Sequence, residues 1–188
     1  ARSLKKKDHE SFGGWIGFVK PVDTLRGRLM LVGGLTLFSL FVSLIEHMLG
    51  LYGELRALVR TGPTTELANI EPASAAVLAG LSYAFLKTSG SEEILVRGLL
   101  YKRLIRWFGM RVANLAQSLF FTLVHNGIIY AAMPDAPLVL HVDIFVRVFV
   151  LSWVLGWYIE RRDGGSIFMA WMCHGIINFL TFLSFFAA

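Results

Sequence analysis

The chain has 188 residues and a formal net charge of +5, with 55% apolar and only 16% charged residues. Soluble proteins typically contain about 25% charged residues, so this composition argues against a soluble domain and favours a single membrane domain. The basic residues are neither gathered on one amphipathic element nor interleaved with aromatic residues, which argues against nucleic-acid binding. Cys173 is the single cysteine and therefore has no partner for an internal disulfide bond.

Residues 1–28 are polar and basic, and no apolar core of a cleavable signal peptide is visible in them. We expect them to form a basic cytoplasmic or interfacial segment. Within it, residues 13–19 (GGWIGFV) form either a short amphipathic piece that enters the membrane interface, anchored by Trp15, or a partly ordered tail. Residues 29–188 are predicted to form the transmembrane helical domain.

Five stretches are nearly free of charge over about the length that crosses a membrane. They predict an all-α protein, a polytopic transmembrane helical bundle of about five spans. The predicted spans are residues 29–51, 73–100, 112–133, 144–159 and 166–188. Small polar residues interrupt the second span, so we expect a kink or local unwinding near Gly90. Glu46 and His47, near the far end of the first span, are expected to reach the headgroups.

The basic residues between the spans predict the orientation of the bundle. Residues 1–28, 101–111 and 160–165 contain seven, four and two Lys or Arg residues, whereas the intervening loops, 52–72 and 134–143, contain two and none. Basic loops stay on the cytoplasmic side. The N-terminus is therefore predicted to be cytoplasmic, and we expect an integral protein of the bacterial cytoplasmic (inner) membrane.

Ionisable residues inside the second span mark a candidate functional site, because charges at membrane depth are costly. Glu93 and Arg97 are four residues apart and share a helix face. Glu92 points about 100° away from Glu93, given 3.6 residues per turn. One carboxylate can therefore be held by the arginine while the other stays free, although Glu93–Arg97 also fits a plain intramembrane ion pair.

Two other spans carry polar residues at the same helical spacing. Phe121 and His125 are four apart in the third span, and His174 and Asn178 are four apart in the fifth. Each pair presents one face to neighbouring helices. Counted along the helices, these faces could meet that of Glu93 in the inner half of the membrane. Taken singly, each His also fits a packing residue, and Asn178 also fits an interhelical hydrogen bond.

A carboxylate, two imidazoles and a carboxamide around one point predict water-mediated acyl hydrolysis. The carboxylate would act as general base on a water, while a histidine would orient that water or relay its proton. Imidazole and amide N–H groups would stabilise the developing oxyanion. Alternatively, Glu92, His125 and His174 could bind zinc with an open coordination site, although the helical zinc motif HExxH is absent. We expect no cofactor.

Together, the three polar sets resemble the signature of the CAAX-processing and bacteriocin-processing intramembrane protease family, also called the Abi or type II CAAX protease family. Its pattern is EExxxR, FxxxH and HxxxN, in that order on separate transmembrane helices. The corresponding segments here are EEILVR at 92–97, FTLVH at 121–125 and HGIIN at 174–178. The resemblance covers about residues 73–186, and Val96 and the unusual Lys87 depart from the family pattern.

The resemblance implies roles for these residues. Glu92 would activate the attacking water with help from His125, Glu93 and Arg97 would support the site, and His174 and Asn178 would form the oxyanion hole. It implies peptide or membrane-protein substrates: eukaryotic and archaeal relatives remove the last three residues of prenylated CAAX proteins, whereas bacterial members more often process peptides, confer bacteriocin immunity or act as scaffolds.

Three functions remain open from the sequence. The favoured one is an intramembrane endopeptidase that works near the cytoplasmic face. The second is a non-proteolytic structural or assembly subunit of a larger membrane complex, in which His47, His125 or His174 could even ligate a pigment or haem. The third is a proton-coupled transporter, but the symmetric pair of broken helices that would support it is absent from the predicted spans.

Overall fold

The computed structural model describes residues 11–51, 53, 70, 71 and 73–186, so the predicted loop 52–72 lies almost wholly outside the described residues. Within them every regular element is helical, which confirms the predicted all-α class. The elements are α1 (Phe12–Ile16), α2 (Leu25–Met48), α5 (Ala73–Ser82), the π-helices η1 (Tyr83–Gly90) and η2 (Glu93–Tyr101), α6 (Lys102–Ala132), α7 (Leu138–Arg161) and α8 (Phe168–Phe186).

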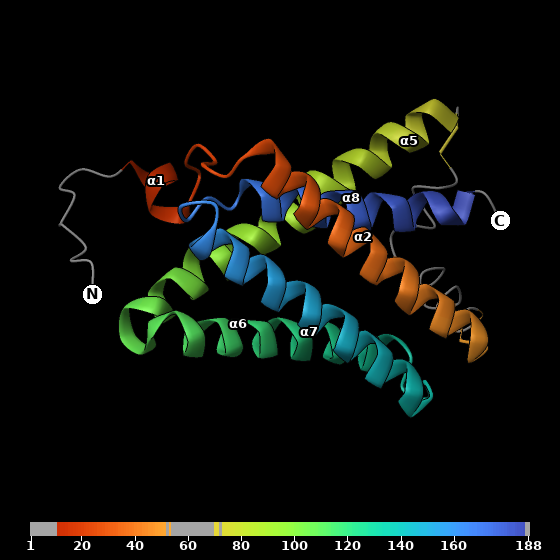
Figure 1. Ribbon diagram of the computed structural model, residues 1–188. Coiled ribbons are helices and arrows are strands. Elements are labelled where there is room, and N and C mark those ends of the chain that lie inside the picture. Colours follow the sequence, from red (N-terminus) through yellow and green to blue (C-terminus); the bar gives the residue numbers. More distant parts are fainter. Residues whose placement is uncertain (1–10, 52, 54–69, 72, 187–188) are drawn as a thin grey trace.

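Three helical runs in the described part of the chain are long and apolar enough to cross a membrane, namely residues 25–48, 73–132 and 138–161. The apolar helix 168–183 is shorter. The 60-residue run is folded back on itself at Gly109, whose φ of 74° and ψ of 165° are not helical. A glycine adopts this backbone without the steric cost of a Cβ. Figure 1 shows the two arms diverging from this bend.

The predicted second and third spans are therefore two arms of one helical run. The basic segment between them, residues 101–111, is helical on both sides of Gly109 rather than an open loop. Together with α2, α7 and α8, these arms account for the five predicted spans.

The expected irregularity near Gly90 is present as π-helical winding in η1 and η2. Side-chain hydroxyl groups donate hydrogen bonds to backbone carbonyls along this stretch. Thr88 Oγ1 donates to the carbonyl of Ala84 at 2.9 Å, and Ser89 Oγ donates to the same oxygen at 2.6 Å. A Cβ on Gly90 would lie 2.8 Å from the carbonyl oxygen of Phe85. Single π-helical turns often occur at functional sites, and the candidate carboxylates follow directly.

Close helix packing in the bundle depends on glycines that face other helices. Helices α6 and α7 run side by side (Figure 1), and a Cβ on Gly156 would lie 2.1 Å from Asn114 Oδ1. Helix α8 packs on η1, where a Cβ on Gly175 would lie 2.4 Å from the ring of Phe85. Small residues at helix contacts let backbones approach closely in membrane bundles. These contacts fix the positions of η2, α6 and α8 around the site.

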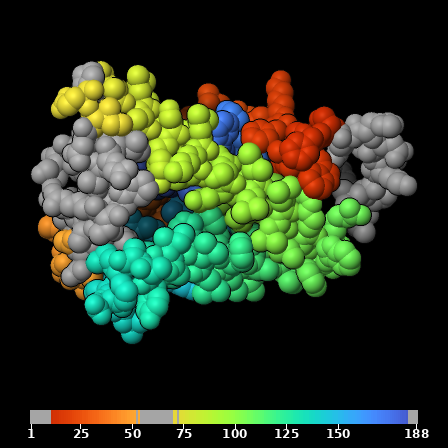
Figure 2. Space-filling view, turned by 180° about the vertical axis from the view of Figure 1, so that it is seen from behind, coloured from red at the N-terminus to blue at the C-terminus, as the bar shows by residue number. Residues whose placement is uncertain are grey.

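Residues 11–24 form a strap across the end of the bundle that contains Gly109. Of the two alternatives for residues 13–19, the short helical piece is present as α1, and a Cβ on Gly98 of η2 would lie 2.7 Å from the carbonyl oxygen of Ile16. Asp163 Oδ1 accepts hydrogen bonds from the backbone N–H groups of Val22 and Asp23, each at 3.0 Å. Figure 2 shows the red strap against the green segment. This part of residues 1–28 is therefore packed on the bundle rather than loosely attached.

The interpretation of Glu46 as a headgroup contact is wrong. Its side chain is buried, and Arg147 of α7 donates a hydrogen bond to its carboxylate. The basic partner lies 101 residues away in sequence and approaches because α2 and α7 pack together. The buried carboxylate thus has a protein partner instead of lipid headgroups.

Candidate functional site

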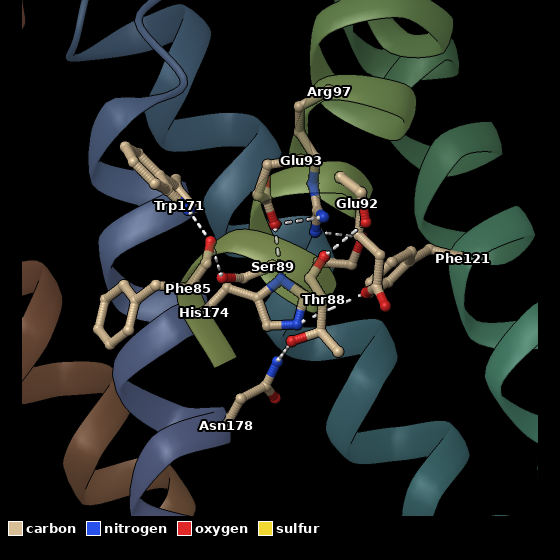
Figure 3. Close-up of polar contacts among 12 residues, drawn as sticks. Phe85, Thr88, Ser89, Glu92, Glu93, Arg97, Phe121, Trp171, His174 and Asn178 are labelled. Atoms are coloured by element: carbon tan, nitrogen blue, oxygen red, sulfur yellow. Dashed lines mark hydrogen bonds and ion pairs between the residues drawn. The ribbon is translucent and has the colours of Figure 1, made fainter. Parts of the chain in front are cut away.

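Three segments bring the sequence-predicted residues together inside the bundle (Figure 3). The stretch around η2 supplies Glu92, Glu93 and Arg97, α6 supplies His125, and α8 supplies His174 and Asn178. The i, i+4 spacing within each helix places each pair on one face, and the packing of α6 and α8 against η1 and η2 turns these faces toward each other. All six residues lie in one neighbourhood.

Glu93 is the fully buried centre of this group. Its Oε1 accepts hydrogen bonds from Arg97 Nη1 at 2.7 Å and from His174 Nδ1 at 2.9 Å. The exposed fractions of the Glu93 and Arg97 side chains are 0% and 1%, so both ions have left water. Such a pair persists when its geometry is good, although Glu93 Oε2 and Arg97 Nε are buried without a hydrogen-bond partner in the described residues. Glu93 therefore holds the arginine and orients the imidazole.

Arg97 makes further contacts that the sequence motifs did not indicate. Its Nη2 donates to Ser152 Oγ of α7 at 3.0 Å, and its guanidinium lies 4.6 Å from the centre of the Phe121 ring. Ser152 Oγ in turn donates to Gln117 Oε1 at 3.2 Å. Gln117 Nε2 contacts Asn114 Oδ1 at 2.9 Å, so a buried polar network runs from the site along the interface of α6 and α7.

Glu92 is held differently from its neighbour, as the 100° separation of the two side chains predicted. Its Oε2 is buried and has no hydrogen-bond partner in the described residues. It lies 3.8 Å from His125 Nε2 and 3.7 Å from His174 Nε2. These distances exceed a direct hydrogen bond and lie within the range of an ion pair with a protonated imidazole. The Glu92 side chain as a whole is 33% exposed, whereas that of Glu93 is fully buried.

The hydrogen bonds of the two imidazoles assign their tautomers. His125 Nδ1 lies 2.9 Å from the carbonyl oxygen of Phe121, which can only accept, so Nδ1 carries a proton and donates. His174 Nδ1 donates to Glu93 in the same way. Both Nε2 atoms consequently face Glu92, and both rings are fixed in orientation by the group behind them.

Asn178 completes the site from the next turn of α8. Its Nδ2 donates to Thr88 Oγ1 at 3.2 Å, which fixes the carboxamide on the side of η1 (Figure 3). A cavity of about 230 Å³ lies beside these groups. Its walls come from η2, α6, α7 and α8 and include Arg97, His125, Arg147, Ser152, His174 and Asn178. The site therefore faces an internal space with both apolar and basic walls.

The residues that could hold zinc are Glu92, His125 and His174. The described residues contain no group of three or more His, Cys, Asp or Glu side chains arranged to hold a metal ion, so we derive no step through a metal. Lys87 has an exposed side chain, and its ammonium group lies 5.0 Å from the ring centre of Tyr83. It forms no ion pair with Glu92 within the described part of the chain.

In the comparison with known families, the family described as Type II CAAX prenyl endopeptidase Rce1-like matches residues 71–180, more than half of the chain. This range contains all six site residues and excludes α1 and α2. It confirms the family resemblance drawn from the three motifs. The search of curated proteins and that of solved structures give no match.

Proposed function

Because the chain belongs to the type II CAAX prenyl endopeptidase Rce1-like family, we propose that it is an intramembrane endopeptidase whose Glu92 activates the attacking water. The orphaned Glu92 Oε2, buried between two imidazole Nε2 atoms, is the observation that carries the proposal. A carboxylate oxygen that accepts no hydrogen bond and lies 3.7–3.8 Å from two fixed imidazoles is suited to accept a proton from water.

The proposed reaction begins with a water held between Glu92 and His125. Glu92 takes one proton from this water while the water oxygen forms a bond to the carbonyl carbon of the scissile peptide. The carbonyl π electrons move to the oxygen, and N–H groups of His174 and Asn178 stabilise the resulting oxyanion. When the C–N bond breaks, the proton held by Glu92 passes to the leaving amine. The second proton of the water also passes to the amine, so the products are a carboxylate and an ammonium group.

Glu93 and Arg97 support this chemistry without contacting the scissile bond. The buried Glu93 carboxylate accepts the Nδ1–H of His174 at 2.9 Å and so fixes the direction in which its Nε2 points. With a proton on Nε2 as well as on Nδ1, His174 would present Nε2–H toward the developing oxyanion. Arg97 balances the charge of Glu93 and fixes its position. The substrate is a peptide or membrane protein that reaches the cavity from the bilayer.

We further propose a location in the bacterial cytoplasmic membrane, with the strap on the cytoplasmic side. Lys102, Arg103, Arg106 and Arg162 lie at the same end of the bundle as the strap: Arg103 stacks 3.3 Å from the Trp15 ring, and Arg162 lies 3.5 Å from Asp23. Excess basic residues at one end of a helical bundle indicate the cytoplasmic side. A cysteine placed at Arg106 tests this orientation, because a membrane-impermeant thiol reagent should label it only in inverted vesicles.

The proposed activity is tested in phosphatidylcholine vesicles with a farnesylated CAAX peptide that carries a fluorophore and a quencher. Glu92→Gln and His125→Ala should each reduce the cleavage rate about 100-fold or more, since general acid–base catalysis contributes about 10²–10⁴-fold. Glu160→Gln is the matched control, because Glu160 lies outside the site and pairs with Lys102. A zinc chelator should leave the wild-type rate unchanged.

Cleavage that survives Glu92→Gln contradicts the proposal. Loss of cleavage on chelation, restored by added zinc, contradicts the assignment of water activation to Glu92 alone and favours the zinc alternative. If the wild type cleaves no peptide and instead co-purifies stoichiometrically with a larger membrane complex that tolerates Glu92→Gln, the non-proteolytic alternative holds.

A further inference from the structure

A second cavity, of about 430 Å³, lies away from the catalytic groups at the end of the bundle that carries the strap. It opens between the start of α6 and the end of α7, and its lining is Met110, Arg111, Asn114, Trp153, Trp157 and Arg161. Its volume is within the range of about 300–1,000 Å³ typical of small-ligand pockets. It shares no lining residue with the catalytic cavity.

The charge of this cavity is uncompensated in the described part of the protein. Arg111 and Arg161 come from different helices and both have exposed side chains. Neither forms an ion pair with a described carboxylate. Helix α6 contains no acidic residue, and the neighbouring Glu160 of α7 lies 3.5 Å from Lys102 instead. Two arginines that line one cavity are a suitable arrangement for binding a phosphate.

The tryptophans that line the rest of the cavity indicate that it lies at the level of the membrane surface. Trp153 and Trp157 are partly exposed, with exposed fractions of 36% and 44%, and lie along the outer side of α7. Indole rings prefer the headgroup level of a bilayer, where one edge is apolar and the other polar. Asn114 forms the buried base, with its amide held by the Trp153 carbonyl at 3.0 Å. A soluble anion would not need the aromatic wall.

We propose that this cavity binds the headgroup of an anionic phospholipid, with Arg111 and Arg161 on its phosphate and the two indoles beside its glycerol backbone. Basic pockets between transmembrane helices on the cytoplasmic side bind such headgroups. Asn114 contacts Gln117, which contacts Ser152 and through it Arg97. The lipid therefore sits at the outer end of the polar network that leads to the catalytic site.

The test counts bound lipid by native mass spectrometry of the full chain in detergent, titrated with dioleoylphosphatidylglycerol or dioleoylphosphatidylcholine. The wild type should retain phosphatidylglycerol in preference to phosphatidylcholine. Arg111→Gln combined with Arg161→Gln should weaken phosphatidylglycerol binding about 30-fold, or about fivefold for each arginine near the membrane surface. Arg26→Gln combined with Arg106→Gln is the matched control, since both are exposed arginines outside the cavity and remove the same charge.

Equal loss of lipid in the cavity pair and the control pair overturns the proposal, because binding would then follow net charge alone. Equal retention of both lipids by the wild type also overturns it. Displacement of phosphatidylglycerol by millimolar inorganic phosphate would assign the cavity to a soluble phosphate instead. The arginines are exposed, so the variants should unfold at the wild-type temperature in phosphatidylcholine. A tenfold loss with Trp153→Leu alone, at unchanged charge, would support the headgroup site independently.

Discussion

Arg97 and Ser152 lie 55 residues apart in sequence, and the guanidinium Nη2 of the first donates a hydrogen bond of 3.0 Å to the hydroxyl of the second. This contact ties η2 to α7 directly beside the candidate catalytic carboxylates. Arg97 also donates a hydrogen bond to Glu93, and Glu93 accepts one from His174. The orientation of the His174 imidazole therefore depends on Ser152, although the structure gives no hydrogen bond from Ser152 to Glu93 or His174. Ser152 is therefore a positioning residue.

Ser152→Ala should lower kcat about tenfold with KM nearly unchanged. A hydrogen bond to a charged group contributes about 1.5–3 kcal/mol, and tenfold in rate corresponds to about 1.4 kcal/mol. Ser152→Thr should restore most of the rate, because it keeps the hydroxyl. The measurement is steady-state cleavage per amount of folded protein.

The matched control for Ser152 is Thr122→Val, which removes another buried hydroxyl, one that bonds to the Ser118 carbonyl of its own helix at 2.7 Å. Its kcat should stay within about twofold of the wild type. Equal effects of the two substitutions would show that buried hydroxyls act through general packing rather than through Arg97.

Glu93 and Arg97 should be coupled strongly in stability. Removing either partner of a buried ion pair costs about 3–5 kcal/mol, because the other charge stays buried without compensation. Glu93→Gln combined with Arg97→Met should therefore be less destabilising than the sum of the two single substitutions. Reversible unfolding in mixed micelles measures the four variants of this double-mutant cycle.

The effect of Glu160→Gln on stability is the control for the buried pair of Glu93 and Arg97. The Lys102 and Glu160 side chains are about one-fifth exposed and 3.5 Å apart, and partly solvated pairs contribute at most about 1 kcal/mol. Additive effects of Glu93→Gln and Arg97→Met would contradict the coupling.

The site residues were predictable because each pair repeats at helical spacing within one span. Glu93 and Arg97 show this, and the 100° turn between Glu92 and Glu93 already separated a held carboxylate from a free one. Ser152 was not predictable in the same way. It lies alone in an apolar run of α7, and only the packing of α7 on α6 brings it to Arg97.

The fold departs from the sequence reading where local signals compete. The basic segment 101–111 was read as a connection because it is charged, yet its residues continue the helix and the bend is confined to Gly109. The glycine itself was the available signal. The pairing of Glu46 with Arg147 had a weaker signal, opposite charges in two spans, and the relative placement of α2 and α7 cannot be derived from helical periodicity.

Gly156→Ala should destabilise the protein by about 1–3 kcal/mol and lower its cleavage activity. A Cβ at Gly156 would lie 2.1 Å from Asn114 Oδ1 and 2.8 Å from Gln117 Nε2, so the added methyl group collides with the network behind Ser152. Gly127→Ala is the matched control on α6, because nothing lies within 4 Å of its Cβ position. It should be neutral or stabilise the helix by up to about 1 kcal/mol. Equal unfolding temperatures for the two variants would contradict the close contact of α6 and α7.

Asp163→Ala should release the strap from the bundle while the membrane helices stay folded. The fully buried Asp163 accepts the backbone N–H groups of Val22 and Asp23, and no other described acceptor contacts them. Without the carboxylate, these two N–H groups find new hydrogen-bond partners only if the strap separates from the bundle and exposes them to water. Amide hydrogen exchange at Val22 and Asp23 should therefore accelerate at least tenfold.

Asp135→Ala removes an exposed carboxylate from the opposite end of α6 and should leave that exchange unchanged. Amides in the middle of α7 report whether the bundle itself has loosened, and they should exchange at the wild-type rate in both variants. If Val22 and Asp23 stay protected in Asp163→Ala, the strap is held by the packing of Ile16 on Gly98 and by the hydrogen bond from Ile167 N–H to the Gly17 carbonyl at 3.0 Å. Asp163 would then not be needed to hold the strap on the bundle, and the contacts at the end of α1 would hold it instead.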